Sequence, residues 1–102
     1  MAVCPEGAIS ETCRELGTLH FGARNEIGFI GGQLRIGEAM APPLIKRVRA
    51  AADPSRIILI DAPPGTSCPV ITAMNGADFV LLVTEPTPFG LHDLKLAVEA
   101  VK

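Results

Sequence analysis

Asp61 is the residue of this sequence whose position suggests chemistry most directly. It follows four consecutive apolar residues, 57–60, and precedes the segment Ala-Pro-Pro-Gly-Thr. The apolar run predicts a short buried strand, and ligands of open α/β sheets bind beyond the carboxyl ends of the strands. A carboxylate there can hold Mg²⁺ directly or through water, and Mg²⁺ in turn holds nucleotide phosphates. Asp61 is therefore the candidate catalytic and metal-binding residue; the alternative is an aspartate that ends a strand and caps the next turn.

The loop after Asp61 has a composition suited to approaching a phosphate. Pro63 and Pro64 stiffen its backbone, and Gly65 leaves a backbone N–H free to approach a phosphate because it has no Cβ. A second loop, residues 84–87, follows the apolar run 79–83 and is expected at the same edge of the sheet.

Two strands and two helices are expected in the carboxy-terminal part of the chain. Residues 57–60 and 78–83 predict buried strands, residues 69–75 a short helix, and residues 91–101 a helix with apolar residues on one face. The order strand, helix, strand, helix indicates an α/β fold with a right-handed parallel crossover.

The amino-terminal part predicts an irregular hairpin and a further helix. Residues 18–23 and 27–36 are expected to form the hairpin, with a bulge or turn at the Gly-Gly pair. A helical turn is expected over residues 11–16, capped by a serine. A helix is expected from the Ala-Pro-Pro segment at residue 41 to about residue 51, with an apolar stripe.

Length, charge and composition narrow the class of protein. The 102 residues suffice for one domain at most, and 48% of them are hydrophobic, as in a globular chain. The net charge of −2 gives no reason to expect a nucleic-acid partner. The apolar runs are much shorter than the ~20 residues of a membrane span. Three widely spaced cysteines do not make a disulfide framework, so a cytoplasmic location is expected.

Two parts of the sequence resemble one known family. The segment IILIDAPPGTSCPVITAMNGADFVLLVTEPTPFGLHDLKLAVEAV is similar to the Walker B and switch II half of the MinD/ParA-type P-loop ATPases. Within that family, the chain resembles the MinD-superfamily ATPases that carry an inserted bacterial-ferredoxin domain. The segment CPEGAI resembles the end of the ferredoxin cysteine motif. The segment GGQLRIGEAMAPPLIKRV resembles the part of the chain that leads from the ferredoxin insert back into the ATPase domain.

The resemblance implies a partial P-loop NTPase fold, Rossmann-like with parallel strands and crossover helices, preceded by an irregular hairpin. It implies that Asp61 orients Mg²⁺ through water and that Gly65 senses the γ-phosphate of ATP. Pro64 and Thr66 would shape this switch, and Pro86, in the loop after the second apolar run, would flank the nucleotide pocket or a dimer face.

The same resemblance divides the chain and assigns its first cysteine. Residues 1–36 would be the end of the ferredoxin-like insert with its return hairpin, and residues 37–102 the partial nucleotide-binding domain. Cys4 precedes proline, like the last cysteine of a bacterial ferredoxin motif, and would bind a 4Fe-4S cluster in the parent protein. In this chain alone a cluster is not expected. Cys68 has two readings, a small buried residue near a helix start or a cluster ligand.

The phosphate-binding loop of the family, G-x-x-x-x-G-K-[ST], does not occur in this sequence. The chain is therefore expected to be a carboxy-terminal piece of an ATPase, inactive alone, with unpaired strand edges that favour a homodimer or higher association. Two other functions stay open. One is a non-catalytic dimerisation or interaction module, and the other is an iron–sulfur electron-transfer or cluster-carrier protein.

Overall fold

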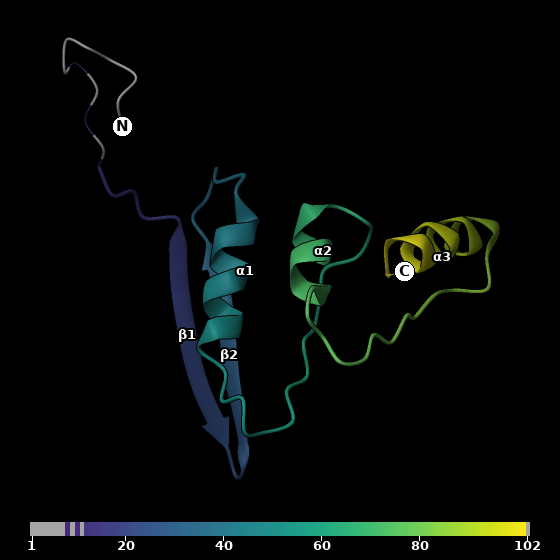
Figure 1. Ribbon diagram of the computed structural model, residues 1–102, viewed down its shortest axis with the longest axis horizontal. Coiled ribbons are helices and arrows are strands. Elements are labelled where there is room, and N and C mark those ends of the chain that lie inside the picture. The colour runs from purple at the N-terminus through teal and green to yellow at the C-terminus, as the bar shows by residue number, and fades with distance from the viewer. Residues whose placement is uncertain (1–7, 9, 11, 102) are drawn as a thin grey trace.

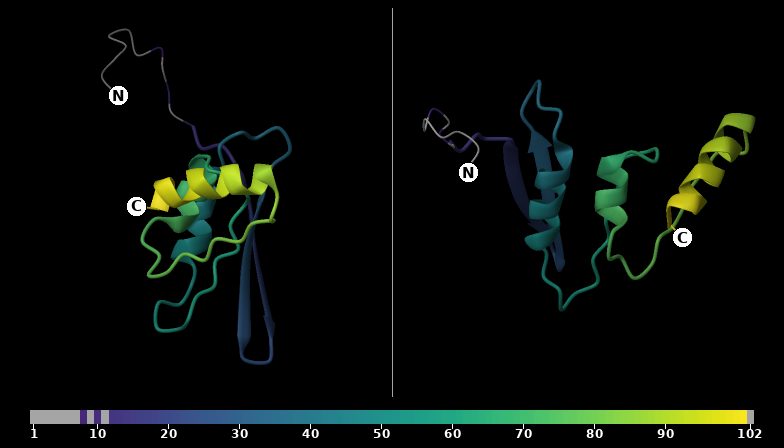
Figure 2. Two further views of the ribbon diagram at one scale, coloured as in Figure 1. Left: turned by 90° about the vertical axis from the view of Figure 1, so that its right-hand side faces the viewer. Right: turned by 45° about the horizontal axis from the view of Figure 1, so that its top comes forward.

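A computed structural model describes residues 8, 10 and 12–101 of the chain. Figure 1 shows a hairpin, a helix lying against it, a second helix beside the first and a third helix at the far side; the views of Figure 2 show the same order. The elements are β1 (Gly17–Arg24), β2 (Ile27–Leu34), α1 (Ala41–Ala50), α2 (Cys68–Met74) and α3 (Pro88–Val101).

The hairpin predicted from the sequence is confirmed. β1 and β2 pair antiparallel from Gly17 opposite Leu34 to Arg24 opposite Ile27. A two-residue turn joins them, and its first residue, Asn25, has a φ of 55°, a conformation that asparagine tolerates better than most residues. The Gly-Gly pair lies within β2 in regular register, so the expected bulge or turn at that point is wrong.

The missing side chain of Gly32 lets α1 approach the hairpin closely. A Cβ at Gly32 would lie 2.8 Å from Cγ2 of Val48 and 3.0 Å from Cγ of Leu44. These two residues belong to the predicted apolar stripe of α1, a helix that starts with prolines in its first turn. The apolar stripe of α1 therefore packs against β2.

The helix α2 provides the buried centre of the molecule. It packs against α1, and its Val70 and Ala73 keep only 6% and 3% of their surface exposed. Both carboxy-terminal helices were predicted. α3 begins earlier than expected, at Pro88, because the hydroxyl of Thr87 accepts a hydrogen bond of 3.0 Å from the N–H of Gly90 and caps the helix.

The predicted fold class is wrong. Among the described residues, the sheet consists of β1 and β2 alone, and their pairing is antiparallel. Residues 57–60 and 78–83 have no strand partner there, so the chain is a small α/β protein without the parallel, Rossmann-like strands of a P-loop fold. A buried strand needs hydrogen-bonded neighbours and cover on both faces, and α1, which could have supplied cover, lies on β2.

The helical turn predicted over residues 11–16 is also wrong for its described part, residues 12–16, which are not helical. The N–H of Arg35 donates a hydrogen bond of 2.9 Å to the carbonyl oxygen of Leu16, so the chain before β1 continues the pairing of the hairpin.

The molecule is extended for its length. Its radius of gyration is 17.8 Å, whereas a compact chain of this length would have about 13 Å. No helix of the described residues combines the length and the apolar character needed to cross a membrane.

Candidate functional site

Asp61 is exposed and follows an extended apolar segment, residues 57–60. Within the part of the chain that the structure describes, no hydrogen bond or ion pair involves its side chain. The N-cap of α2 is Ser67, six residues further along the chain. The carboxylate is thus open to solvent and does not cap the helix that follows it.

Gly65 gives the loop after Asp61 its shape. Its φ is 96°, a value that residues other than glycine rarely adopt. A Cβ at this position would have no other atom within 4 Å. Thr66, like the rest of residues 61–67, is exposed, and the peptide bonds at Pro63 and Pro64 are trans. The loop therefore offers an open carboxylate and an open backbone for a ligand.

Residues 61–67 fit one part of a magnesium–nucleotide site. The carboxylate of Asp61 suits Mg²⁺, and the open backbone at Gly65 suits a phosphate oxygen. The loop contains no lysine or arginine, so it has no side chain that could neutralise a triphosphate. A phosphate-binding segment would have to come from elsewhere.

The hydroxyl groups of the second predicted loop, residues 84–87, form hydrogen bonds with the first turn of α3. The hydroxyl of Thr84 donates a hydrogen bond of 2.9 Å to the carbonyl oxygen of Gly90, and Thr87 caps the helix. Pro86 between them is exposed. No hydrogen bond or ion pair joins this loop to Asp61 among the residues described.

The described cysteines do not form a metal site. Cys13 and Cys68 are both free and exposed, so the expectation that Cys68 is a buried structural residue is wrong. In the described part of the chain no cluster of three or more His, Cys, Asp or Glu side chains could hold a metal ion. Cys4, the predicted iron–sulfur ligand, lies outside the described residues.

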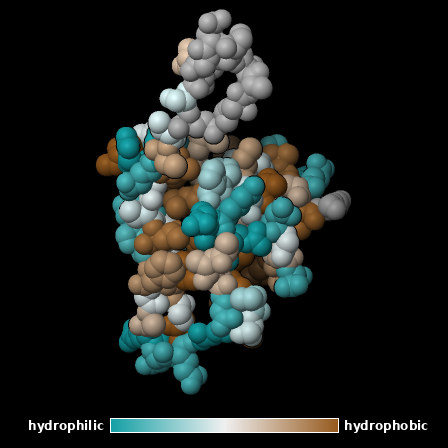
Figure 3. Space-filling model, turned by 60° about the vertical axis from the view of Figure 1, so that its left-hand side comes forward, coloured by the Kyte–Doolittle hydropathy of each residue, from teal (hydrophilic) through white to brown (hydrophobic). Residues whose placement is uncertain are grey.

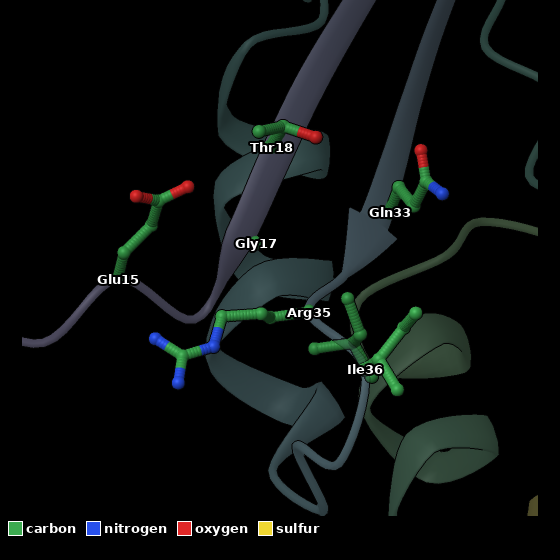
Figure 4. Close-up of a pocket in the computed structure, with 7 residues that line it drawn as sticks. Glu15, Gly17, Thr18, Gln33, Arg35 and Ile36 are labelled. Atoms are coloured by element: carbon green, nitrogen blue, oxygen red, sulfur yellow. The ribbon is translucent and has the colours of Figure 1, made fainter.

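Two shallow hollows lie away from Asp61. One, of about 190 Å³, lies at the open end of the hairpin, and Figure 4 shows Glu15 and Arg35 extending to one side of it and Gln33 to the other. The second, of about 300 Å³, lies between α2 and α3 and is lined largely by apolar residues, among them Met74 and Val80. Thr18 lines the first hollow, and its hydroxyl is hydrogen-bonded to Nε2 of His20 at 3.2 Å.

Two charged residues that the sequence analysis did not single out hold the helices in place. The Glu38 side chain is only 7% exposed, forms an ion pair with Arg14 and accepts a hydrogen bond of 3.0 Å from the N–H of Met40, just before α1. The Arg49 side chain reaches from α1 to carbonyl oxygens of α2. The role of Glu38 could have been predicted, because an acidic residue close to the start of a helix is favourable. The role of Arg49 could not, because a contact between two helices leaves no local pattern in the sequence.

Two proteins of Methanocaldococcus jannaschii are similar to this chain. Uncharacterized protein MJ0579 is 35% identical over 75 residues, which cover 72% of this chain and 28% of that protein. Uncharacterized protein MJ0578 is 30% identical over 81 residues, covering 72% of this chain and 29% of that protein. The chain thus spans less than a third of the length of these relatives. No protein-family model and no solved structure matches the chain.

Proposed function

We propose that this chain is part of a larger MinD/ParA-type ATPase associated with iron–sulfur clusters, and that residues 61–66 respond to its magnesium–nucleotide complex. One observation carries the proposal. An exposed carboxylate, Asp61, ends an extended apolar segment, and four residues later the exposed Gly65 has a φ of 96°, with no other atom within 4 Å of where its Cβ would lie.

Asp61 would hold Mg²⁺ through water, and the N–H of Gly65 would approach the terminal phosphate of ATP. Pro64 and Thr66 would limit the conformations of the loop, and Pro86 would lie beside the nucleotide or a dimer face. When bound, Mg²⁺ neutralises phosphate charge during phosphoryl transfer to water. Movement of the loop with nucleotide state would pass to a partner or to an iron–sulfur centre, for which Cys4 is the proposed ligand.

The chain alone is expected to hydrolyse no ATP, because neither a lysine-bearing phosphate loop nor any other basic residue accompanies residues 61–67. The residues that cradle the phosphates would belong to the longer protein. A cytoplasmic location is part of the proposal, since the free thiols of Cys13 and Cys68 suit a reducing compartment.

Amide chemical shifts of the ¹⁵N-labelled chain, recorded during titration with Mg·ATP, test the proposal. We expect weak, saturable changes centred on Asp61, Gly65 and Thr66 that require Mg²⁺. Asp61→Asn should abolish the magnesium-dependent part, whereas Asp78→Asn, which changes another exposed carboxylate beside an apolar segment, should leave it intact.

A second pair of variants tests the backbone of the loop. Gly65→Ala should weaken the response about tenfold, because a left-handed conformation costs other residues about 1–2 kcal/mol. Gly37→Ala is the matched control, since Gly37 has a φ of 82° with equally open surroundings and lies outside the loop. Shifts spread over the whole chain, an unchanged response in Asp61→Asn, or ATP turnover by the purified chain would each contradict the proposal.

A non-catalytic interaction module is the second candidate function. The exposed apolar segments 57–60 and 79–83 favour it, because such surfaces mark sites of protein association. A chain that associates with a protein partner and shows no shift with Mg·ATP would support this function over the first.

A further inference from the structure

The segment that contains Asp61 and Gly65 is held by hydrogen bonds only at its two ends. Among the described residues, no hydrogen bond and no ion pair involves any residue from 57 to 66. The nearest hydrogen bonds along the chain are those of Arg56 on one side and those of α2 on the other. The position of Asp61 therefore depends on what these two ends are attached to.

The first end is attached to the turn of the hairpin. The guanidinium group of Arg56 donates a hydrogen bond to the carbonyl oxygen of Glu26, between β1 and β2, and its Nη1 would lie 3.9 Å from a Cβ at Gly28. The backbone of Arg56 is fixed as well, because its N–H donates a hydrogen bond of 3.2 Å to the carbonyl oxygen of Asp53. Figure 1 shows the chain after α1 passing the closed end of the hairpin on its way to α2.

The second end is attached to the same part of the molecule. The helix α2 begins at Cys68, and Arg49 of α1 donates hydrogen bonds to carbonyl oxygens at the end of α2. The helix α1 in turn lies on β2 at Gly32. Both ends of the segment 57–66 are thus attached, through one arginine each, to the hairpin and the helix that covers it.

The residues between Arg56 and Asp61 are suited to transmit a movement. Three of the four are isoleucines, whose branched Cβ atoms favour an extended backbone. An extended segment rises about 3.3 Å per residue and keeps its direction, whereas a chain rich in glycine and serine would absorb a change at one end. Releasing Arg56 from the hairpin turn should therefore displace the carboxylate of Asp61.

We propose that Arg56 is a positioning residue, which fixes Asp61 by holding the hairpin turn and thereby couples this turn to the loop 61–66. The coupling is reciprocal: a change at the turn alters the affinity of the loop for Mg·ATP, and Mg·ATP alters the turn. The nucleotide part of this coupling rests on the proposed function. Residues 24–26 are exposed, and Figure 3 shows hydrophilic side chains at the closed end of the hairpin, so little packing opposes a movement of the turn.

Amide chemical shifts and ¹⁵N relaxation of the chain without nucleotide test the positioning. In Arg56→Met, which removes the donor, we expect changed shifts at Asp61 and Gly65 and order parameters of residues 57–66 that fall below about 0.6, the range of flexible backbone. Arg56→Lys keeps a donor for the carbonyl oxygen and should restore at least about half of the loss. Arg24→Met is the control, because Arg24 is exposed beside the turn and makes no side-chain hydrogen bond among the described residues.

Gly28 allows a second test that leaves Arg56 in the chain. Gly28→Val places a branched side chain beside Nη1 of Arg56 and should displace the guanidinium group, with the same effect on the loop as Arg56→Met. Valine also favours a strand, so the hairpin is retained. Gly28→Ala is the matched control, because its Cβ makes an ordinary contact of 3.9 Å. Circular dichroism identifies any Arg56 variant that has lost its helices, and Gly28→Val then decides the question.

Titration of the chain with Mg·ATP tests the coupling. Smaller shift changes at Glu26 and Ile27 should follow the same dissociation constant as those of the loop, and Arg56→Met should abolish them and raise that constant at least about fivefold. Loop changes without changes at Glu26 and Ile27, a loop unaffected by Arg56→Met, or an equal effect of Arg24→Met would each overturn the proposal. If Mg·ATP changed no shift at all, the proposed function would fail, and the measurements without nucleotide would still decide whether Arg56 positions Asp61.

Discussion

The guanidinium group of Arg49, in α1, donates a hydrogen bond of 3.1 Å to the carbonyl oxygen of Thr72, in α2. The same nitrogen also donates to the carbonyl oxygen of Asn75, the residue that follows α2. The last carbonyl groups of a helix have no partner within the helix, and a cation near them is favourable. One half-buried side chain thus terminates α2 and fixes it against α1.

Replacing Arg49 should therefore destabilise the contact between these helices. Arg49→Met keeps much of the side-chain volume and removes both hydrogen bonds, and we expect a loss of about 1–3 kcal/mol in the free energy of unfolding. Arg47→Met is the control, because Arg47 is exposed and makes no side-chain hydrogen bond among the described residues. Urea denaturation of both variants at one protein concentration measures the difference. Equal losses would show that Arg49 contributes only a general surface charge.

Gly32 should be a sensitive position of the hairpin. Gly32→Ala introduces a methyl group 2.8 Å from Cγ2 of Val48, closer than packed carbon atoms come. Either α1 moves away from β2 or the side chains of α1 rearrange, and overpacking of this kind costs about 1–3 kcal/mol. Thermal unfolding followed by circular dichroism measures the change.

Gly22→Ala is the control for that substitution. A Cβ at Gly22 would make an ordinary contact of 3.9 Å with Cβ of Phe29. Replacing a strand glycine in a conformation that alanine can adopt should have little effect or stabilise the chain by about 0.4–1 kcal/mol. If Gly32→Ala were tolerated as well as Gly22→Ala, then α1 would not lie on β2 as described.

The elements that depend on neighbouring residues could be predicted from the sequence. The hairpin followed from two apolar segments around a short polar turn, and α1 from prolines in its first turn and a stripe of apolar residues. The earlier start of α3 depends on the hydroxyl of Thr87, a local signal that was available in the sequence.

The arrangement of these elements could not be predicted from the same patterns. The apolar character of residues 57–60 and 79–83 predicts that something covers them but does not say what. In the structure, α1 lies on β2 because Gly32 admits it, and this contact joins residues sixteen apart in the sequence, Gly32 and Val48. With α1 on β2, the apolar segments 57–60 and 79–83 keep large exposed side chains.

The sequence determines the local features of the candidate loop but not how the loop packs. Its exposed carboxylate and the open backbone at Gly65 both lie in one loop, where residue types fix the local shape. Whether Asp61 and Pro86 lie beside the same ligand depends on how two segments distant in the sequence pack. The amino-acid composition of these segments does not determine that packing. The exposed position of Cys68 has the same cause, because a cysteine at a helix start is buried only if another element covers it.

The turn after α1 should make stability depend on pH at the acidic end. Hydrogen bonds from the hydroxyl and the backbone N–H of Ser55, 2.7 Å and 3.0 Å long, lower the pKa of Asp53 below its ordinary value, and the positive charge of Arg56 adds to this. A carboxylate with a lowered pKa stabilises the folded chain above the unfolded pKa, and this contribution disappears as the pH falls through the folded pKa.

Ser55→Ala should therefore raise the pKa of Asp53 toward its ordinary value, because the hydroxyl donor is the largest cause of its lowering. The midpoint of urea unfolding should then fall less steeply on acidification below about pH 4, the region of the ordinary aspartate pKa. Carboxyl ¹³C titration by NMR measures the pKa directly. Ser67→Ala is the control, since Ser67 precedes α2 without a side-chain capping bond and should change neither quantity. An unchanged pKa of Asp53 in Ser55→Ala would mean that the turn does not keep this geometry in solution, and the acid dependence would then have to come from other carboxylates.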